Sequence, residues 1–259
     1  FIDDGLMREN EPQDVASIFG GLGIRVEVVD ARKAFFRALK GKLDPEDKRK
    51  AFRQTFYEVF GAAVKKSKCR FLIQGTIAAD IIETKGGVKT QHNILEQIGI
   101  NPEKGFGFKV IEPIQELFKP DVRRLAKALE LPKSVYRRMP FPGPGLMTRV
   151  LGAVTPERVA VVRRATRIVE DEILSRRPFQ AFAVLLDDKG TGVEDGKRKF
   201  GEIVIIRSVE SKNAMTARAS RVPWRRLRKM AKRITTEIPS VTRVCYELTG
   251  KPPATIEYI

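Results

Sequence analysis

Apolar positions recur along this chain with two periods, one typical of helices and one typical of strands. Residues 45–67 carry apolar side chains at three- and four-residue spacing, such as Phe52 and Phe56, which predicts an amphipathic helix. Asp44 and Pro45 stand before this stripe as a cap and a first helical residue. The stripe is long enough to bury one face of the helix against a core.

The same patterns predict the other elements. Helices are expected at residues 12–22, 120–130, 156–175 and 223–237, and strands at residues 25–30, 71–73, 108–111, 181–186, 202–207 and 243–248. Strands that alternate with helices predict a parallel α/β sheet in the first part, with residues 71–73 as a short buried strand. The second part is expected to be a smaller α+β domain. Because a Pro/Gly stretch at 140–145 separates the parts, the predicted domains are 1–139 and 140–259.

The net charge of +17 indicates anionic partners. The basic residues are spread along the chain and the aromatic residues are mostly Phe at core-like positions, so phosphate-bearing small molecules suit the charge as well as nucleic acid does. No nucleic-acid partner is therefore expected. No apolar run approaches the length of a membrane span, and no membrane partner is expected.

Histidine and cysteine are scarce. The single histidine, His92, leaves little material for a histidine metal site or a catalytic triad. Cys69 and Cys245 stand in separate apolar, strand-like runs without metal-ligand spacing. They are expected to be buried, reduced thiols of a cytoplasmic protein.

A strand-to-helix turn at residues 74–83 is the first candidate binding segment. Ligands of parallel sheets bind beyond the carboxyl ends of the strands. Gly75 allows close backbone approach, Thr76 has a hydroxyl for a phosphate, and the Asp80 carboxylate suits Mg²⁺. An ordinary turn with a capping threonine is the alternative interpretation.

Two lysines are further candidates for phosphate contacts. Lys89 follows Gly86 and Gly87, as in a loop that closes over phosphates, although the sequence alone favours an exposed polar loop. Lys119 stands at a predicted helix start, where the helix already favours anions, or is simply solvated. The charge run at residues 48–50 is either a solvated helix face or an anion contact.

Two rigid segments lie more than a hundred positions apart. The segment 250–259 carries two adjacent prolines between Lys251 and Glu257, which would direct a cation toward a phosphate and a carboxylate toward a sugar hydroxyl. The segment 140–146, PFPGPGL, is the second. Together they are interpreted as two walls of a nucleotide pocket, or else as a pinned terminus and a stiff linker.

These segments resemble the ATP-pyrophosphatase part of GMP synthase, in the form that has separate subunits in archaea. The matching stretches, in the order of that family, are FIDDGLMRENE, DPEDKRK, QGTIAADIIE, KTQHN, EPIQELFKPDVR, PFPGPGL with Arg149, MTA and KPPATIEY. PFPGPGL and KPPATIE are the specific ones. The resemblance implies an N-type, Rossmann-like ATP-pyrophosphatase domain followed by a dimerisation domain.

The resemblance also implies a ligase that adenylates xanthosine monophosphate (XMP) with ATP and Mg²⁺ and lets ammonia displace AMP, giving GMP. It implies ATP contacts from Gly75, Thr76, Asp80 and Lys119, catalytic roles for Lys89, Lys119 and Asp80, Mg²⁺ on Asp80, and XMP contacts from Arg49, Pro142, Gly143, Arg149, Lys251 and Glu257. A homodimer through residues 140–259 is expected.

Three departures from that family qualify the expectation. Its glycine-rich pyrophosphate loop would lie before Phe1, so the 259 residues are expected to lack part of the ATP site. Gln91 stands where a second histidine beside His92 is usual. No glutaminase domain is present, so ammonia is expected from solution or from a separate glutamine amidotransferase subunit. The rival interpretations are another pyrophosphatase-type enzyme, acting on tRNA, and a nucleic-acid-binding protein without enzymatic activity.

Overall fold

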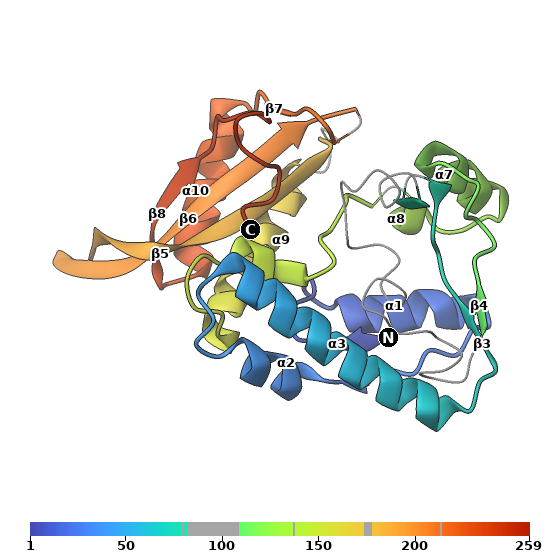
Figure 1. The fold of residues 1–259 in the computed structure, drawn as a ribbon. Coiled ribbons are helices and arrows are strands. Elements are labelled where there is room, and N and C mark those ends of the chain that lie inside the picture. The colour runs from blue at the N-terminus through green and yellow to red at the C-terminus, as the bar shows by residue number, and fades with distance from the viewer. Residues whose placement is uncertain (79, 82–108, 137, 174–177, 213) are drawn as a thin grey trace. The chain divides into compact units, whose positions relative to one another are not determined.

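The computed structural model describes residues 1–78, 80–81, 109–136, 138–173, 178–212 and 214–259 (Figure 1). Internal contacts group the chain into two compact units. Unit 1 consists of Phe1–Tyr57 and Met139–Ile259, and unit 2 is Glu58–Arg138. The predicted domains 1–139 and 140–259 stay a prediction. The helix and sheet content is mixed α/β, with small parallel sheets.

A four-stranded sheet forms the centre of the second half of unit 1. Strands β5 (Gln180–Glu194) and β6 (Lys197–Glu210) form an antiparallel hairpin. Short β7 (Arg218–Ala219) pairs antiparallel to β6, whereas β8 (Val241–Tyr246) pairs parallel to it. The hairpin is much longer than the predicted strands 181–186 and 202–207, because its outer half is polar and exposed and so carries no apolar pattern.

The hairpin turns at two residues that suit a tight connection. Asp195 and Gly196 both have positive φ, 49° and 74°. An Asp-Gly pair in this conformation matches the right-handed twist of the two strands. The turn residues, and not an apolar pattern, therefore mark the outer end of the hairpin in the sequence.

Two helices cover one face of this sheet. Helix α9 (Pro156–Ile173) packs on β5, and α10 (Trp224–Glu237) packs on β8 and on α9 (Figure 1). Their buried apolar residues recur at helical spacing: Val159, Val162, Ala165, Ile168, Val169 and Ile173 on α9, and Met230 and Ile234 on α10. The helices predicted at 156–175 and 223–237 are confirmed.

The opposite face of the sheet is covered by the segment that follows β8. Phe182, Val184 and Val209 form a buried cluster there with Ile256. Because side chains alternate between faces along a strand, this cluster and the helices draw on different residues of β5 and β6. The last residues of the chain therefore belong to the core of unit 1.

The first residues of unit 1 form a smaller α/β layer. Strand β1 (Ile2–Asp3) pairs parallel to β2 (Val29–Asp30), and the helices are α1 (Glu11–Gly21) and α2 (Arg32–Leu39). Helix α3 (Pro45–Ser67) begins in unit 1, and its residues from Glu58 onward belong to unit 2. Asp44 Oδ1 accepts the N–H groups of Glu46 and Asp47, which caps α3 as predicted. The strand predicted at 25–30 is limited to Val29–Asp30.

Unit 2 contains parallel β3 (Phe71–Ile73) and β4 (Lys109–Ile111), followed by α7 (Lys119–Ala128) and α8 (Lys133–Tyr136). The strand at 71–73 forms, but the prediction that it is buried is wrong. Phe71 is 52% exposed and Ile73 is 72% exposed. Within the described residues, β4 is the strand that pairs with β3.

The prediction of buried thiols is also wrong. Cys69 and Cys245 are both exposed, and neither forms a disulfide. Cys69 lies in the loop before β3, and Cys245 occupies an outward position of β8, whose residues alternate between less and more exposed. An apolar neighbourhood in the sequence did not indicate which face of the strand these residues occupy.

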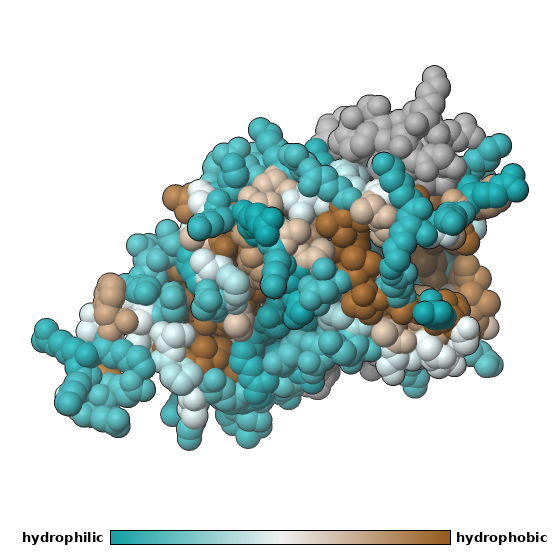
Figure 2. Space-filling model, turned by 90° about the horizontal axis from the view of Figure 1, so that it is seen from below, coloured by the Kyte–Doolittle hydropathy of each residue, from teal (hydrophilic) through white to brown (hydrophobic). Residues whose placement is uncertain are grey.

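The surface is mainly hydrophilic on the face that Figure 2 presents, with hydrophobic side chains between the polar ones. Several large apolar side chains are nevertheless exposed, including Trp224 at 73%. The expectation that Phe residues occupy core positions therefore holds for Phe35 and Phe182 but fails for Phe71. None of the helices in the described ranges is long and apolar enough to cross a membrane.

Candidate active site

A glycine positions the rigid segment 140–149 against the N-terminal segment. Gly145 begins the 3-10 helix η1 (Gly145–Arg149) with a φ of 65°, and a Cβ there would lie 2.5 Å from the Leu6 carbonyl oxygen. The next N–H, that of Leu146, donates to the same oxygen at 2.7 Å. A side chain at residue 145 would therefore break the contact that fixes η1.

Helix η1 brings Arg149 against Glu257. Arg149 Nε donates to Glu257 Oε2 at 3.0 Å and Arg149 Nη2 to Oε1 at 2.9 Å, which is a two-bond fork. The arginine side chain is 1% exposed, and its guanidinium lies 4.0 Å from the centre of the Phe182 ring. Gln180 donates a further hydrogen bond to the same carboxylate. Glu257 of the predicted wall 250–259 thus forms a partly buried ion pair with Arg149, which lies three residues after the predicted wall 140–146.

Arg8 is a second arginine beside this pair, and the sequence analysis missed it. Its Nε pairs with Glu170 at 3.1 Å, its Nη2 donates to the Met139 carbonyl at 3.1 Å, and its guanidinium lies 4.2 Å from the Phe141 ring centre. Arg149 also lies over Phe141, at 5.1 Å. Burial lowers the pKa of Arg8. The sequence signal that could have identified Arg8 is its position just before the acidic start of a helix.

The two guanidiniums have buried donors to spare. Nη1 of Arg8 and Nη1 of Arg149 are both buried, and among the described residues neither has a hydrogen-bond partner. A buried donor without an acceptor costs about 1–3 kcal/mol. Oxygen atoms of a ligand would satisfy both, so the surroundings of Phe141 suit an anionic or carbonyl-bearing molecule.

The backbone of Lys251 is held by a pair of hydrogen bonds to Ala217. Its N–H donates to the Ala217 carbonyl at 2.7 Å, and the Ala217 N–H donates back at 3.0 Å. Its ammonium donates to the Ala214 carbonyl at 2.9 Å, and cis peptide bonds precede Pro252 and Pro253. One of three ammonium protons is used in this way, so the group still has donors for a phosphate.

A fully buried arginine, Arg207 on β6, holds the same C-terminal segment. It donates to the carbonyls of Ile256, Thr249 and Thr255 at 2.9, 3.0 and 2.7 Å, and it pairs with Glu247 at 2.8 Å. The sequence analysis missed it as well, because the apolar run 202–207 indicated only packing. Arg207 is a positioning residue for Lys251 and Glu257.

In the charge run at residues 48–50, near the start of α3, Lys48 and Arg49 have different surroundings. The Lys48 side chain is fully buried and its ammonium donates to the Val150 carbonyl at 3.2 Å, so the interpretation of a solvated face is wrong for this residue. Burial lowers the pKa of Lys48. Arg49 pairs with Glu46 one turn earlier on the same helix. The structure therefore places Lys48, and not Arg49, against the segment that follows η1.

The two remaining candidates of segment 140–146 lie at its surface. Pro142 is half-buried and its carbonyl accepts the Gly145 N–H at 3.0 Å. Gly143 is exposed, with open space where a Cβ would be. Neither residue forms a side-chain hydrogen bond with Arg149 or Glu257 in the described part of the chain, so their XMP roles stay predictions.

The candidates on the ATP side belong to unit 2. Gly75 is exposed after β3, the buried Thr76 hydroxyl donates to the Glu112 carboxylate, and Asp80 Oδ2 accepts the Ile77 N–H at 3.0 Å. The Thr76 proton is therefore already used, and donation to a phosphate requires a rotation of this hydroxyl. No group of three His, Cys, Asp or Glu residues suited to a metal occurs within the described ranges.

The two lysine candidates differ in what the structure describes. Lys119 is exposed at the first residue of α7, where N–H groups of the first turn point outward. Lys89 lies outside the described residues, as do Gln91 and His92.

Known relatives match this chain over its full length. It is 52% identical to a glutamine-hydrolysing GMP synthase subunit of Thermococcus kodakarensis, covering 100% of this chain and 83% of the relative. The corresponding subunits of Pyrococcus horikoshii and Archaeoglobus fulgidus are 50% and 48% identical, with the same coverage. The chain belongs to the GMP synthase family. The family model for the GMP synthase C terminal domain matches residues 150–258.

The residues matched by this family model include most of the second half of unit 1. The segment 150–258 contains the β5–β8 sheet, Gln180, Arg207, Lys251 and Glu257. Arg149 directly precedes it. The full-length similarity also extends over Thr76, Asp80 and Lys119 in unit 2.

Proposed function

We propose that this chain is the synthetase subunit of a two-subunit GMP synthase. It is a C–N ligase that converts XMP to GMP. The observation that carries this conclusion is 52% identity over the whole chain to a named GMP synthase subunit. None of these relatives favours the alternative of an enzyme acting on tRNA.

The reaction that we propose has two steps. The C2 oxygen of XMP attacks the α-phosphorus of ATP, the bond to the β-phosphate oxygen breaks, and pyrophosphate leaves as one proton is lost from the base. Ammonia then attacks C2, the bond from C2 to the adenylate oxygen breaks, and AMP leaves as the nitrogen loses a proton. A poor oxygen leaving group has thereby become AMP.

The ATP side is proposed to consist of Gly75, Thr76, Asp80, Lys89 and Lys119. Gly75 leaves room for phosphate against the backbone, and Lys119 adds charge at a helix N-terminus where pyrophosphate would leave. Mg²⁺ requires only one or two carboxylates together with substrate phosphates, so the single carboxylate of Asp80 suits it. When bound, the ion would neutralise charge on the phosphates.

The XMP side is proposed to consist of Arg49, Pro142, Gly143, Arg149, Lys251 and Glu257. The ion pair of Arg149 with Glu257 refines the expectation from the sequence, because Arg149 holds the carboxylate in place and keeps only Nη1 for the ligand. Arg8 adds a second such donor beside Phe141. A ligand oxygen on each donor would remove the cost of about 1–3 kcal/mol of a buried donor without an acceptor.

The remaining features are proposals that rest on the family resemblance. They are an N-type, Rossmann-like ATP-pyrophosphatase domain, ammonia from a separate glutamine amidotransferase subunit, and a homodimer through residues 140–259. A cytoplasmic location belongs with them. The word subunit in the names of the relatives supports a partner chain.

The test is GMP formation from XMP, ATP, Mg²⁺ and ammonium, followed by separation of the nucleotides. Both the 259-residue chain and a version extended at the N-terminus to the length of the relatives are assayed. We expect the extended protein to form GMP, AMP and pyrophosphate in equal amounts. An extended protein that forms no GMP and binds XMP no better than other nucleotides would overturn the proposal.

A second assay replaces ammonium with glutamine and a purified glutaminase subunit. We expect a complex of the two chains and GMP formation that depends on both. Ammonia-dependent activity that the glutaminase subunit leaves unchanged, without a detectable complex, would contradict the partner.

A further inference from the structure

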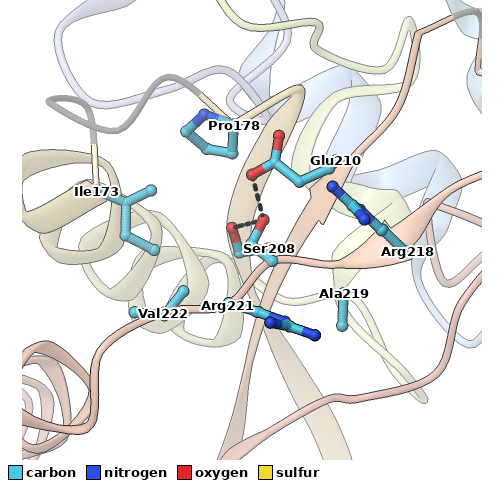
Figure 3. Close-up of a pocket in the computed structure, with 9 residues that line it drawn as sticks. Ile173, Pro178, Ser208, Glu210, Arg218, Ala219, Arg221 and Val222 are labelled. Carbon is cyan, nitrogen blue, oxygen red and sulfur yellow. Dashed lines mark hydrogen bonds between the residues drawn. The ribbon is translucent and has the colours of Figure 1, made fainter.

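A pocket lies on the side of the sheet away from the C-terminal segment. Arg207 and Val209 of β6 face that segment, and the alternating residues Ser208 and Glu210 face the other way, toward the end of α9. The pocket has a volume of about 480 Å³ (Figure 3). It is lined by Ile173, Pro178, Ser208, Glu210, Arg218, Ala219, Ser220, Arg221 and Val222.

A chain of hydrogen bonds fixes the polar centre of this pocket. Ser208 Oγ donates to Ser220 Oγ at 2.9 Å, and Ser220 Oγ donates to Glu210 Oε1 at 2.9 Å. Ser208 is fully buried and Ser220 is 8% exposed. The Tyr246 hydroxyl donates to the Ser220 carbonyl at 2.6 Å, which fixes the backbone directly after β7. The Glu210 carboxylate is therefore held in one orientation, with its second oxygen available as an acceptor.

Two arginines line the same pocket as this carboxylate, and among the described residues neither forms an ion pair with it. Arg218 lies directly opposite Glu210 in the β6–β7 register, a position at which opposite charges normally pair. Within the described part of the chain, however, neither Arg218 nor Arg221 has an ion pair or a side-chain hydrogen bond. Two guanidiniums three residues apart, with all their donors available, form a site for a doubly charged anion such as a phosphate group.

The remaining wall is apolar. Ile173 is 1% exposed, Pro178 is buried and Val222 is half-buried. In Figure 3 these side chains lie on the side of the serines away from Arg218. The volume lies in the usual range for a small-molecule site, and the lining is more polar than apolar, which suits a charged ligand. An apolar wall beside two arginines suits a ligand that joins a flat, weakly polar part to a phosphate.

We propose that this pocket binds a nucleoside monophosphate, with its phosphate on Arg218 and Arg221 and a hydroxyl or amino group on Glu210. The site is separate from the residues assigned to XMP and ATP, and it does not depend on the proposed function. All of its polar contacts come from β6, β7 and the turn after β7.

The single tryptophan of the chain gives a local readout. Trp224 is 73% exposed and lies two residues after Val222. The probe is 5′-AMP, titrated into the full chain while tryptophan fluorescence is recorded, with adenosine as the uncharged comparison. The test variant carries Arg218→Ala and Arg221→Ala.

Matched controls separate this site from general charge and from the active site. Lys197→Ala with Arg198→Ala removes the same charge from exposed positions of β6. Lys251→Ala removes a cation of the proposed XMP site. Both arginines of the test variant are exposed, so circular dichroism is expected to show an unchanged fold.

We expect a saturable response to AMP and none to adenosine. The Arg218/Arg221 variant should raise the Kd at least tenfold, and Glu210→Gln should raise it severalfold, whereas both controls leave it unchanged. An absent response, an equal response to adenosine, or an unchanged Kd in the test variant would each overturn the proposal. A Kd that rises only in Lys251→Ala would assign the AMP to the active site and overturn it as well.

Discussion

Replacing Arg207 with methionine removes the contacts that hold the C-terminal segment on the sheet. The arginine is fully buried, donates to three carbonyls and pairs with Glu247, whose side chain is 14% exposed. Methionine replaces the aliphatic part of the arginine side chain and has no donor, so the change leaves these acceptors without their partner.

The size of the effect follows from what is left behind. Removing one partner of a buried ion pair typically costs about 3–5 kcal/mol. The carbonyls of Thr249 and Thr255 belong to exposed residues and can turn to water, whereas that of Ile256 belongs to a buried residue. We therefore expect the free energy that keeps this segment bound to the sheet to fall by about 3–5 kcal/mol. This is less than the sum of the energies of all the lost contacts.

Hydrogen exchange read by mass spectrometry measures this loss directly. We expect amides of residues 249–258 to exchange several hundredfold faster in Arg207→Met, because about 3.5 kcal/mol of local stability corresponds to that factor. Arg207→Lys should recover part of the protection, since it keeps the charge beside Glu247. Arg198→Met, the same change at an exposed position of β6, is the control.

The reasoning would be refuted by unchanged exchange in residues 249–258. It would equally be refuted if Arg198→Met produced the same acceleration. XMP affinity gives a second readout, because Lys251 and Glu257 lie in the released segment. We expect the affinity to fall in Arg207→Met even though this arginine does not touch the proposed ligand.

Three further predictions concern affinity, assembly and pH. Lys251→Ala should weaken XMP binding about tenfold or more in calorimetry with an unchanged circular dichroism spectrum, and intact affinity would remove this residue from the site. Light scattering at micromolar concentration should give about twice the chain mass of 29.2 kDa, and a monomeric mass would contradict the dimer. Burial raises the pKa of Asp4 to about 6, so folding favours its protonated form. The free energy of unfolding should therefore fall as pH rises from 4 to 6, and Asp4→Asn, which keeps the acceptor for the Leu6 N–H, should abolish that decline in urea titrations.

Elements with a strong apolar period could be predicted from the sequence, and those defined by tertiary contacts could not. The period of α3, α9 and α10 was visible because each buries one face. The outer half of the β5–β6 hairpin has two exposed faces and leaves no such pattern. Its length comes from pairing of the two strands through an Asp-Gly turn.

The same division applies to the candidate site. The rigid segments 140–146 and 250–259 suggested two walls of one pocket, and the family resemblance added Arg149 as a separate XMP contact. The ion pair of Arg149 with Glu257 was not predicted. Arg8 and Arg207 were missed because a lone arginine in an apolar run gives no sign of what it will contact. Lys48 was misjudged for a related reason, since its buried partner is a backbone carbonyl 102 positions away.

The way in which unit 1 is assembled constrains when it can fold. Leu6, in the first segment, accepts a hydrogen bond from η1, and Glu257 completes the ion pair with Arg149. On the ribosome, unit 2 emerges before most of unit 1 has been made. The proposed XMP site therefore cannot form during synthesis of the first 250 residues, and Arg149 of a nascent chain stays without Glu257 until the KPPATIE segment has left the exit tunnel. Codon choice or chaperone capture in that interval would affect the yield of active protein without altering a single contact in the finished fold.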